Sequence, residues 1–410
     1  VRREPDSIGW VDNHRVATAN EGDWKGGTRG WTIFDSRSGK VVWDAGNSFE
    51  LSAIANGHWP ESRAAKKGTE PEGLAIATYR GQRYAFVGSE RGNFVNVYSL
   101  SDPTKPWFLQ MLPSLPGPEG LLPIPERGLF VVSSESDDAS VGIRAGVQVF
   151  SLDKGAPDYP QITASHGIAW GALGALSASG RPGVLYTATD AAYSNTRILT
   201  IDARREPARI VAEMPVTKDG LQATYDVEGL WHKPQGGFWL GVEGETGAGN
   251  KLVEVDAAGA VQREVALPAS YTAKLGKQGI EGVTGSPDGK ALYIAMQREA
   301  KGESVTRIGR LDLASGAFTW WGYPLETTSV EGDWLGLSEI TLVDHDTLAV
   351  IERDKLSGPR ARVKRIGWVQ EKLEGMTIDE RGNVYVITDN DGLKDNTGET
   401  FFANLGRVLR

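Results

Sequence analysis

A short acidic tag, with the pattern glutamate, glycine and an aliphatic residue, recurs along the chain. Between the full copies stand two looser ones and a degenerate one, namely Ser165-His166-Gly167-Ile168, Leu337-Ser338-Glu339-Ile340 and Asp6-Ser7-Ile8. Carboxylates and imidazoles are good ligands for divalent metal ions. The repeated position therefore gives seven candidate metal ligands, Glu72, Glu119, His166, Glu228, Glu281, Glu339 and Glu374.

A second series of polar residues follows the tags, each at the end of a run of β-branched and aromatic residues. Runs of this composition and length are typical of strands. The series consists of Glu21, Glu90, Glu135, Asp190, Glu243, Gln297, Glu352 and Asp389. Because both series recur together, a repeated structural unit must position them.

So many carboxylates in one place would need neutralisation. Two of them about 6 Å apart repel by roughly 3 kcal/mol at an effective dielectric constant near 20. Bound cations, raised pKa values, or basic partners such as Arg91, Lys251, Arg298 or Arg353 must relieve this repulsion. Oxygen ligands with one imidazole suit Ca²⁺ or Mn²⁺, and such an ion can activate water and hold a phosphoryl oxygen. The simplest alternative is that the acids only hydrogen-bond backbone amides and water.

The elements around each tag predict an all-β fold. Most tags begin a series of strand, turn, strand, turn, strand, turn and strand, which is the blade of a β-propeller. Eight tags predict seven or eight blades of four strands. A blade cannot bury both of its faces alone, so we expect one closed domain over residues 1–410. First strands line a propeller channel, which would place the tag residues in one ring and the second series near the channel mouth.

Composition excludes several classes of protein. The net charge of −9 argues against a nucleic-acid partner. The chain has no cysteine, hence no disulfide or thiolate metal site. It contains no apolar run of membrane-spanning length. The motifs of serine hydrolases, P-loop proteins and zincins are also absent from the sequence.

The C-terminal half, about 223–410, resembles the "esterase-like activity of phytase" family. The matching motifs are Tyr225-Asp226-Val227-Glu228-Gly229-Leu230, Gly279-Ile280-Glu281-Gly282-Val283, Leu337-Ser338-Glu339-Ile340, Val350-Ile351-Glu352-Arg353-Asp354, Leu373-Glu374-Gly375-Met376 and Thr388-Asp389-Asn390-Asp391. The front half, about 1–222, resembles the propeller of bacterial proteins labelled alkaline phosphatase or choice-of-anchor, through Thr18-Ala19-Asn20-Glu21-Gly22-Asp23 and Lys67-Gly68-Thr69-Glu70-Pro71-Glu72-Gly73. More distantly, an acidic channel with one histidine is similar to that of the two-metal propeller phosphotriesterases.

These resemblances imply an exported bacterial protein, periplasmic or secreted, that hydrolyses phosphoric esters with a divalent metal. Its partner would be a small phosphate ester or a similar anionic substrate, and the sequence leaves the oligomeric state open. The candidates for catalysis are His166, Glu228 and Glu281, with His166 as a ligand or an acid–base group. Two alternatives remain: a non-catalytic, calcium-stabilised propeller that binds a partner, and a calcium-dependent lactonase or carboxylesterase.

Overall fold

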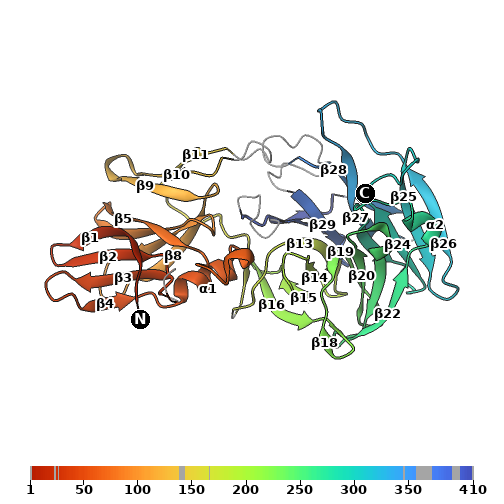
Figure 1. Cartoon of the computed structure of the whole chain (residues 1–410), viewed down its shortest axis with the longest axis horizontal. Coiled ribbons are helices and arrows are strands. Elements are labelled where there is room, and N and C mark those ends of the chain that lie inside the picture. Colours follow the sequence, from red (N-terminus) through yellow and green to blue (C-terminus); the bar gives the residue numbers. More distant parts are fainter. Residues whose placement is uncertain are drawn as a thin grey trace. The chain divides into compact units, whose positions relative to one another are not determined.

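The computed structural model describes residues 2–22, 25, 27–137, 144–165, 167–344, 347–356, 372–389 and 398–408. The chain divides into two compact units. The N-terminal unit comprises Val1–Trp170 and Asn390–Glu399, and the C-terminal unit comprises Gly171–Asp389 and Thr400–Arg410. Most of the regular structure in both units is β (Figure 1), which confirms the predicted all-β class.

The N-terminal unit contains three antiparallel sheets in which the strands follow one another in chain order. Their strands are β1 (Pro5–Asp12), β2 (Arg15–Asn20), β3 (Gly30–Asp35) and β4 (Val41–Asp44); β5 (Pro71–Tyr79), β6 (Gln82–Ser89), β7 (Phe94–Ser99) and β8 (Trp107–Pro113); and β9 (Pro118–Ile124), β10 (Leu129–Ser134) and β11 (Gly146–Ser151). The other elements are α1 (Ser48–Ala55), the 3₁₀ helices η1 (Glu61–Arg63) and η2 (Pro125–Arg127), and the short strand β12 (Ile162–Ala164).

Aromatic side chains hold these three sheets together. The ring of Trp31 in β3 lies 5.0 Å from that of Tyr98 in β7, and Phe86 in β6 stacks on Phe130 in β10 at 4.2 Å. Helix α1 buries Phe49, whose ring lies 5.3 Å from that of Phe94. The first strands β1 and β5 contact each other, as do β5 and β9. The tags on these strands are therefore brought close together.

Besides the small sheet of β17 and β18, the described part of the C-terminal unit contains five antiparallel sheets, whose strands within this unit follow one another in chain order. Their strands are β13 (Leu173–Ala178), β14 (Val184–Thr189), β15 (Arg197–Asp202) and β16 (Ala208–Pro215); β19 (Asp226–His232), β20 (Phe238–Glu243), β21 (Lys251–Val255) and β22 (Val261–Ala266); β23 (Ile280–Gly285), β24 (Ala291–Met296), β25 (Thr306–Asp312) and β26 (Phe318–Tyr323); β27 (Leu335–Leu342) and β28 (Leu348–Asp354); and β29 (Lys372–Ile378), β30 (Val384–Asp389) and β31 (Phe402–Gly406). The remaining elements are β17 (Thr217–Lys218), β18 (Leu221–Gln222), α2 (Ala269–Thr272) and η3 (Gly247–Gly249).

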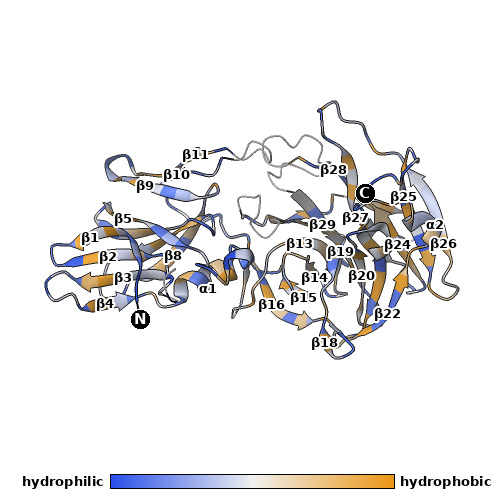
Figure 2. Cartoon of the chain, viewed as in Figure 1, coloured by the Kyte–Doolittle hydropathy of each residue, from blue (hydrophilic) through white to orange (hydrophobic). Residues whose placement is uncertain are grey.

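The first strands of these five sheets lie side by side. β13 contacts β19, β19 contacts β23, β23 contacts β27, β27 contacts β29, and β29 in turn contacts β13. Apolar clusters fill the space between neighbouring sheets, with Trp239, Leu240 and Ile294 fully buried. Figure 2 shows apolar residues along the strands that build these clusters, for example in β16 and β22. Each first strand thus has neighbours on both sides, as in the centre of a propeller.

One prediction about the fold differs in detail from the structure, and others remain untested. The two compact units divide at residue 170, and the meeting of the two family-like halves at 222/223 stays a prediction. The tag at Ser165–Ile168 was expected on a first strand, but the first strand of that sheet, β13, begins later, at Leu173. The number of blades, seven or eight, and their closure into a single domain stay predictions. No helix in the described part of the chain is long and apolar enough to cross a membrane.

Candidate functional site

A register irregularity marks the tag position of the first strands. In β19, Val227 pairs with Val242 but Gly229 pairs with Gly241, so Glu228 is the extra residue of a β-bulge. Bulges re-aim side chains and are common beside active sites. The corresponding residues are Asp6 in β1, Glu119 in β9, Gly174 in β13, Glu281 in β23, Ser338 in β27 and Glu374 in β29, and in β5 the irregularity spans Glu72 and Gly73.

In the C-terminal unit the bulge of β19 assembles three carboxylates, which we call the acidic triad. Asp226 and Glu228 belong to β19, and Glu243 ends the neighbouring strand β20, where it pairs with Asp226. Each of the three offers a carboxylate oxygen within 4.8 Å of the others. The backbone N–H of Ala191 donates to Asp226 at 3.2 Å, and that of Gly279 donates to Glu243 at 2.7 Å. The backbone thus fixes the two outer members of the triad.

The triad has no ion pair with a basic side chain in the described ranges, although the charge of Lys277 acts on Asp226 and Glu243. Burial, and then the charges of Glu281, Asp226 and Glu374, raise the pKa of Glu228 well above its usual range. Burial also raises the pKa of Glu243, to about 7, and that of Asp226. Without a cation, the triad must therefore retain protons near neutral pH.

Two further tag acids lie next to the triad, beside a buried arginine. Glu281 and Glu374 are 3% and 4% exposed. Nη2 of Arg353 lies 2.5 Å from Oε1 of Glu374, and both side chains are buried. Burial, followed by the charge of Glu374, raises the pKa of Glu281 well above its usual range, although Arg353 opposes this effect. This part of the site thus combines an ion pair with a carboxyl group whose pKa is raised.

The sheet of β27 and β28 departs from the predicted alignment by one residue. Ser338 rather than Glu339 occupies the bulge, and Arg353 rather than Glu352 stands opposite Gly336 at the strand end. Glu339, one residue further along, accepts hydrogen bonds from the N–H groups of Ile340 at 2.8 Å and Met376 at 3.5 Å. Its oxygens therefore link β27 to β29 through hydrogen bonds to backbone amides. For this residue the structure thus shows the alternative to metal binding that the sequence left open.

Glu352 also has partners of its own. The hydroxyl of Tyr323 donates to it at 3.0 Å, and the N–H of Glu326 donates at 2.5 Å. These bonds engage both of its carboxylate oxygens away from the triad.

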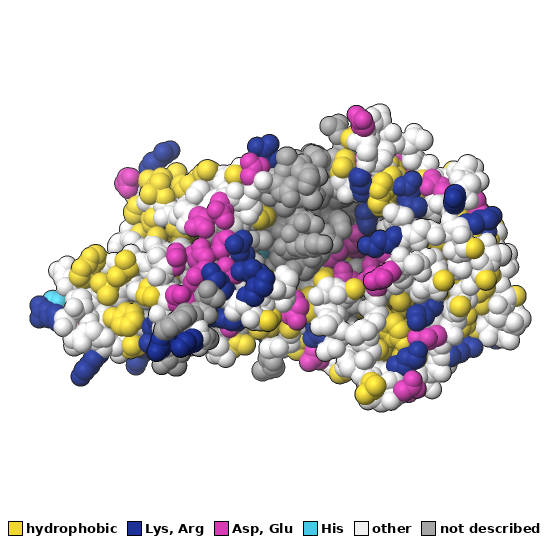
Figure 3. All heavy atoms as spheres, in the orientation of Figure 1, with side chains coloured by type: hydrophobic (Ala, Val, Ile, Leu, Met, Phe, Trp, Pro, Cys, Tyr) yellow, Lys and Arg dark blue, Asp and Glu magenta, His cyan; other side chains and the backbone are white. Residues whose placement is uncertain are grey.

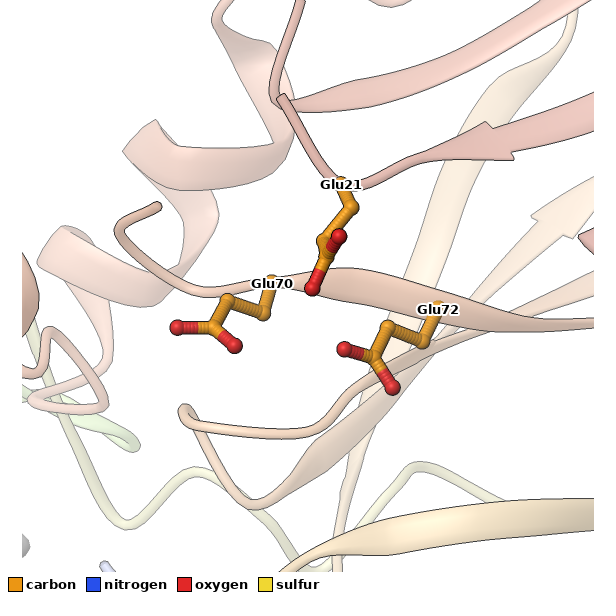
Figure 4. A group of neighbouring side chains, drawn as sticks. All are labelled: Glu21, Glu70 and Glu72. Atoms are coloured by element: carbon orange, nitrogen blue, oxygen red, sulfur yellow. The ribbon is translucent and has the colours of Figure 1, made fainter. Parts of the chain in front are cut away.

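The N-terminal unit holds a second group of acids, which we call the N-terminal cluster: Glu21, Glu70, Glu72, Glu90 and Glu119. Glu21, Glu70 and Glu72 have oxygens within 4.8 Å of one another, as do Glu72, Glu90 and Glu119. Figure 4 shows the first three, with Glu21 following β2 and the other two at the start of β5. Burial, followed by contacts with Glu90 and Glu21, raises the pKa of Glu72 to about 10. Glu72 is therefore neutral at pH 7.

Basic side chains already pair with much of the N-terminal cluster. Lys67 pairs with Glu21, Arg63 pairs with Glu70, and Arg91 lies 2.6 Å from Glu90. Figure 3 shows acidic side chains gathered beside basic ones on this unit. Three cations among five acids make this cluster a weaker candidate for a metal than the triad. Among the basic partners expected from the sequence, Arg91 and Arg353 contact these acids, whereas Lys251 pairs with Glu264 and Arg298 with Glu299.

The remaining predicted site residues are scattered. His166 lies outside the described residues. Glu135 is exposed, as is Glu119 of the N-terminal cluster, and the N–H of Glu135 donates to the carbonyl of Gly117. Asp190 follows β14, accepts the N–H of Ala192 at 2.6 Å, and contributes to raising the pKa of Glu228. Asp389 is a buried residue at the end of β30.

A pocket of about 210 Å³ lies elsewhere in the C-terminal unit, and all five of its first strands contribute to it. Its polar lining consists of hydroxyl groups, among them Ser177, Thr284 and Thr377, which bond backbone N–H groups of His232, Leu342 and Ala178. None of the lining residues is acidic, basic or histidine. The groups able to do chemistry are therefore at the bulges and not in this pocket.

Two contributors were not among the site residues that the sequence predicted. Asp226 stands two residues before the tag glutamate of β19, and Glu70 stands two residues before Glu72. A signal was present, because both acids belong to the motifs that carry the family resemblance. Residues that alternate along a strand lie on the same face, and this spacing of two would have marked them.

Comparison with known families agrees with the two resemblances. Residues 168–370 match the family described as "Esterase-like activity of phytase", and residues 12–103 match the choice-of-anchor I domain. The phytase-like match begins well before residue 223 and includes the whole triad, Glu281 and Arg353, but it ends at residue 370, before the motifs of Glu374 and Asp389. No curated protein matches the chain.

Solved structures with similar folds are distant in sequence. Hsv2 of Kluyveromyces lactis is 10% identical, with 98% of each chain covered and a TM-score of 0.28. The Dos1 propeller is 11% identical, over 98% of this chain and 93% of that one, with a TM-score of 0.30. A putative 6-phosphogluconolactonase from Bacteroides fragilis is 12% identical, over 78% and 85%, with a TM-score of 0.25. Values this low establish nothing about activity.

Proposed function

We propose that this protein is a divalent-metal-dependent hydrolase of phosphoric esters and that its reaction site is the acidic triad. The observation that carries the proposal is that Asp226, Glu228 and Glu243 converge within 4.8 Å inside the phytase-like segment. The family match supports a hydrolase. The dependence on a metal ion and the choice of a phosphoric ester as the substrate go beyond the family match and are part of our proposal.

The triad suits a hard divalent cation. Its donors are carboxylate oxygens, which Ca²⁺ and Mn²⁺ prefer, and no lysine or arginine in the described ranges forms an ion pair with them. Asp226, Glu228 and Glu243 would hold the ion. When bound, a divalent cation supplies the positive charge that attracts a phosphate ester and lowers the pKa of water.

The neighbouring side chains have distinct tasks in this proposal. Burial raises the pKa of Glu281, which favours its protonated form, and in that form it would donate a proton to the oxygen of the leaving group. Glu374 is held by Arg353, so it does not compete for the metal. The site therefore separates metal binding from proton donation.

The chemistry also defines a partner and a location. An anionic small molecule can approach this acidic site only after a cation has reversed its charge. The match to the choice-of-anchor I domain supports a cell-surface or secreted bacterial protein, and we extend this to the periplasm as the other exported compartment. The net charge of −9 disfavours a nucleic-acid substrate.

The test is an assay of the full chain after metal removal and reloading. Protein treated with a chelator is supplied with Ca²⁺ or Mn²⁺ and assayed for hydrolysis of a phosphomonoester, a phosphotriester, a carboxylester and a lactone. We expect phosphoester hydrolysis that requires the metal and is lost in Asp226→Asn. The matched control is Glu254→Gln, which removes a carboxylate of the same unit that pairs with Lys233 and Arg263.

Any of three results would refute this proposal. Phosphoester hydrolysis that survives both the chelator and Asp226→Asn would remove the triad from the reaction. Turnover of only the carboxylester or the lactone would replace the substrate class, and tight metal binding without any turnover would favour a metal-stabilised binding protein.

A further inference from the structure

Strand β28 places a positive charge where neighbouring sheets place an acid or an amide. Arg353 pairs with Gly336 just before the bulge of β27, as Glu243 pairs with Asp226 in the sheet of β19. In the sheet of β23 this position is occupied by Gln297, whose N–H bonds Gly279. The guanidinium therefore belongs to the same series of strand ends as a member of the triad.

The Arg353 side chain is buried but not fully satisfied. The residue is 6% exposed, its Nη2 lies 2.5 Å from Oε1 of Glu374, and its Nη1 donates weakly to the carbonyl of Asp354 at 3.4 Å. Its Nε–H is buried and has no acceptor among the described residues. A guanidinium presents its N–H groups in a planar fork that matches carboxylate and phosphate oxygens.

An unsatisfied donor on a buried charged group is costly, so its retention calls for an explanation. Arg353 lies close enough to Glu374, Glu281 and Glu228 for their charges to act on it. The last of these belongs to the triad, which would hold the metal. The guanidinium that carries the unpaired donor is thus close to both the ion pair and the metal-binding part of the site.

We propose that Arg353 binds the anionic group of the substrate through its Nε–H, so that the site combines one divalent cation with one arginine. This inference rests on the proposed function and deepens it, because it names the second positive group that a phosphate would meet. A second metal ion is disfavoured here, since Glu374 is already engaged by Arg353. Arg353 therefore selects a tetrahedral oxyanion, such as a phosphate monoester, over a neutral ester.

The experiment measures binding rather than turnover. Inorganic phosphate is titrated calorimetrically into the Mn²⁺-loaded full chain, as wild type, Arg353→Lys and Arg353→Gln. We expect Arg353→Gln to weaken phosphate binding by roughly ten- to a hundredfold, since charge-assisted hydrogen bonds are lost. We expect Arg353→Lys, which keeps the charge but lacks Nε–H, to weaken it less. The control Arg298→Gln removes a partly exposed arginine that pairs with Glu299 and should leave phosphate binding unchanged.

Folding and metal binding are measured on the same samples. Mn²⁺ affinity and near-ultraviolet circular dichroism show whether each variant keeps its site, and added guanidinium should partly restore phosphate binding to Arg353→Gln. If Arg353→Gln does not fold, the phosphate affinity of Arg353→Lys is compared with that of the wild type, and this comparison tests the inference.

The outcomes separate this inference from the proposed function. Phosphate binding that is unchanged in a folded, Mn²⁺-loaded Arg353 variant would overturn the inference and leave the proposed function standing. Phosphate binding that depends on Arg353, in a protein that hydrolyses no phosphoester, would support the inference and refute the proposed function. A wild-type protein that binds Mn²⁺ but no phosphate would overturn the inference.

Discussion

The carboxylate of Glu228 lies against the backbone of Gly174, the residue that occupies the bulge of the neighbouring first strand. A Cβ atom on Gly174 would stand 3.2 Å from Oε2 of Glu228, closer than such atoms normally approach. Gly174 is thus the one bulge residue of the C-terminal unit without a side chain, among the described strands, and it makes room for a triad acid. The glycine in β13 therefore leaves the space that the carboxylate of Glu228 occupies.

Substituting alanine for Gly174 should displace the Glu228 carboxylate. We expect Gly174→Ala to lower the affinity for Mn²⁺ by roughly tenfold, as loss of a supporting contact usually does at a metal site. The comparison is a Mn²⁺ titration against Gly276→Ala, where the new Cβ would meet an oxygen of Gln278 at an ordinary 3.4 Å. Equal affinities in the two variants would show that Glu228 does not bind the metal from this position.

Glu339 should behave as a structural residue rather than as a metal ligand. A glutamine in its place offers only one acceptor oxygen to the N–H groups of Ile340 and Met376. We expect Glu339→Gln to lower the free energy of unfolding by about 1–3 kcal/mol, because a buried donor loses its acceptor. Urea unfolding measures this change, with Mn²⁺ affinity unaltered. A variant of normal stability that loses the metal would instead return Glu339 to the ligands predicted from the sequence.

The sequence was sufficient for the class of fold because the tag and the strand-end residue recur together. Each pair starts a first strand and ends a second one, as at Glu228 and Glu243 in β19 and β20. At Ser165–Ile168 the prediction relied on the residue type, and His166 lies outside the described residues, so the bulge of the following strand β13 is the comparison that the structure offers. The aligned residue there is Gly174, which has no side chain by which a motif could reveal it.

The site was only partly accessible to sequence reasoning. An acid at a repeated position could be recognised, but a bulge shifts register by one residue, and this shift decided between Glu339 and Ser338. The same shift hid the strand-end position of Arg353. The N-terminal cluster is paired with Arg63, Lys67 and Arg91, whereas the triad has no ion pair with a basic side chain in the described ranges. This difference depends on contacts between distant segments. Spacing along the chain does not contain that information.

The pH dependence of stability should change sign when metal is supplied. Glu243 and Glu90 each have a pKa of about 7, above the value near 4.5 expected when the chain is unfolded. The folded state therefore binds more protons between these values, so in chelator its stability falls as pH rises through 7. Divalent cations require the ionised acids, and we expect Mn²⁺ affinity to rise by about tenfold per pH unit below pH 7 if one proton is displaced.

Thermal unfolding at about pH 5.5 and about pH 8, with chelator or with Mn²⁺, tests both signs. In chelator the melting temperature should be lower at the higher pH, by a few degrees. With Mn²⁺ the stabilisation should be larger at the higher pH. A melting temperature that rises with pH in chelator would contradict the raised pKa values of these acids.

The two acidic groups should differ in their need for a cation, and a matched pair of substitutions tests this. Glu72 is neutral at pH 7 with a pKa of about 10, so Glu72→Gln resembles the form already present. We expect Glu72→Gln to change neither Mn²⁺ affinity nor unfolding at pH 7 appreciably. Glu228→Gln removes a ligand of the triad and should abolish tight Mn²⁺ binding while leaving the apo protein at least as stable, because it removes a buried ionisable group. A stoichiometry that falls in Glu72→Gln instead would place a metal in the N-terminal cluster, where Lys67, Arg63 and Arg91 now balance the charge.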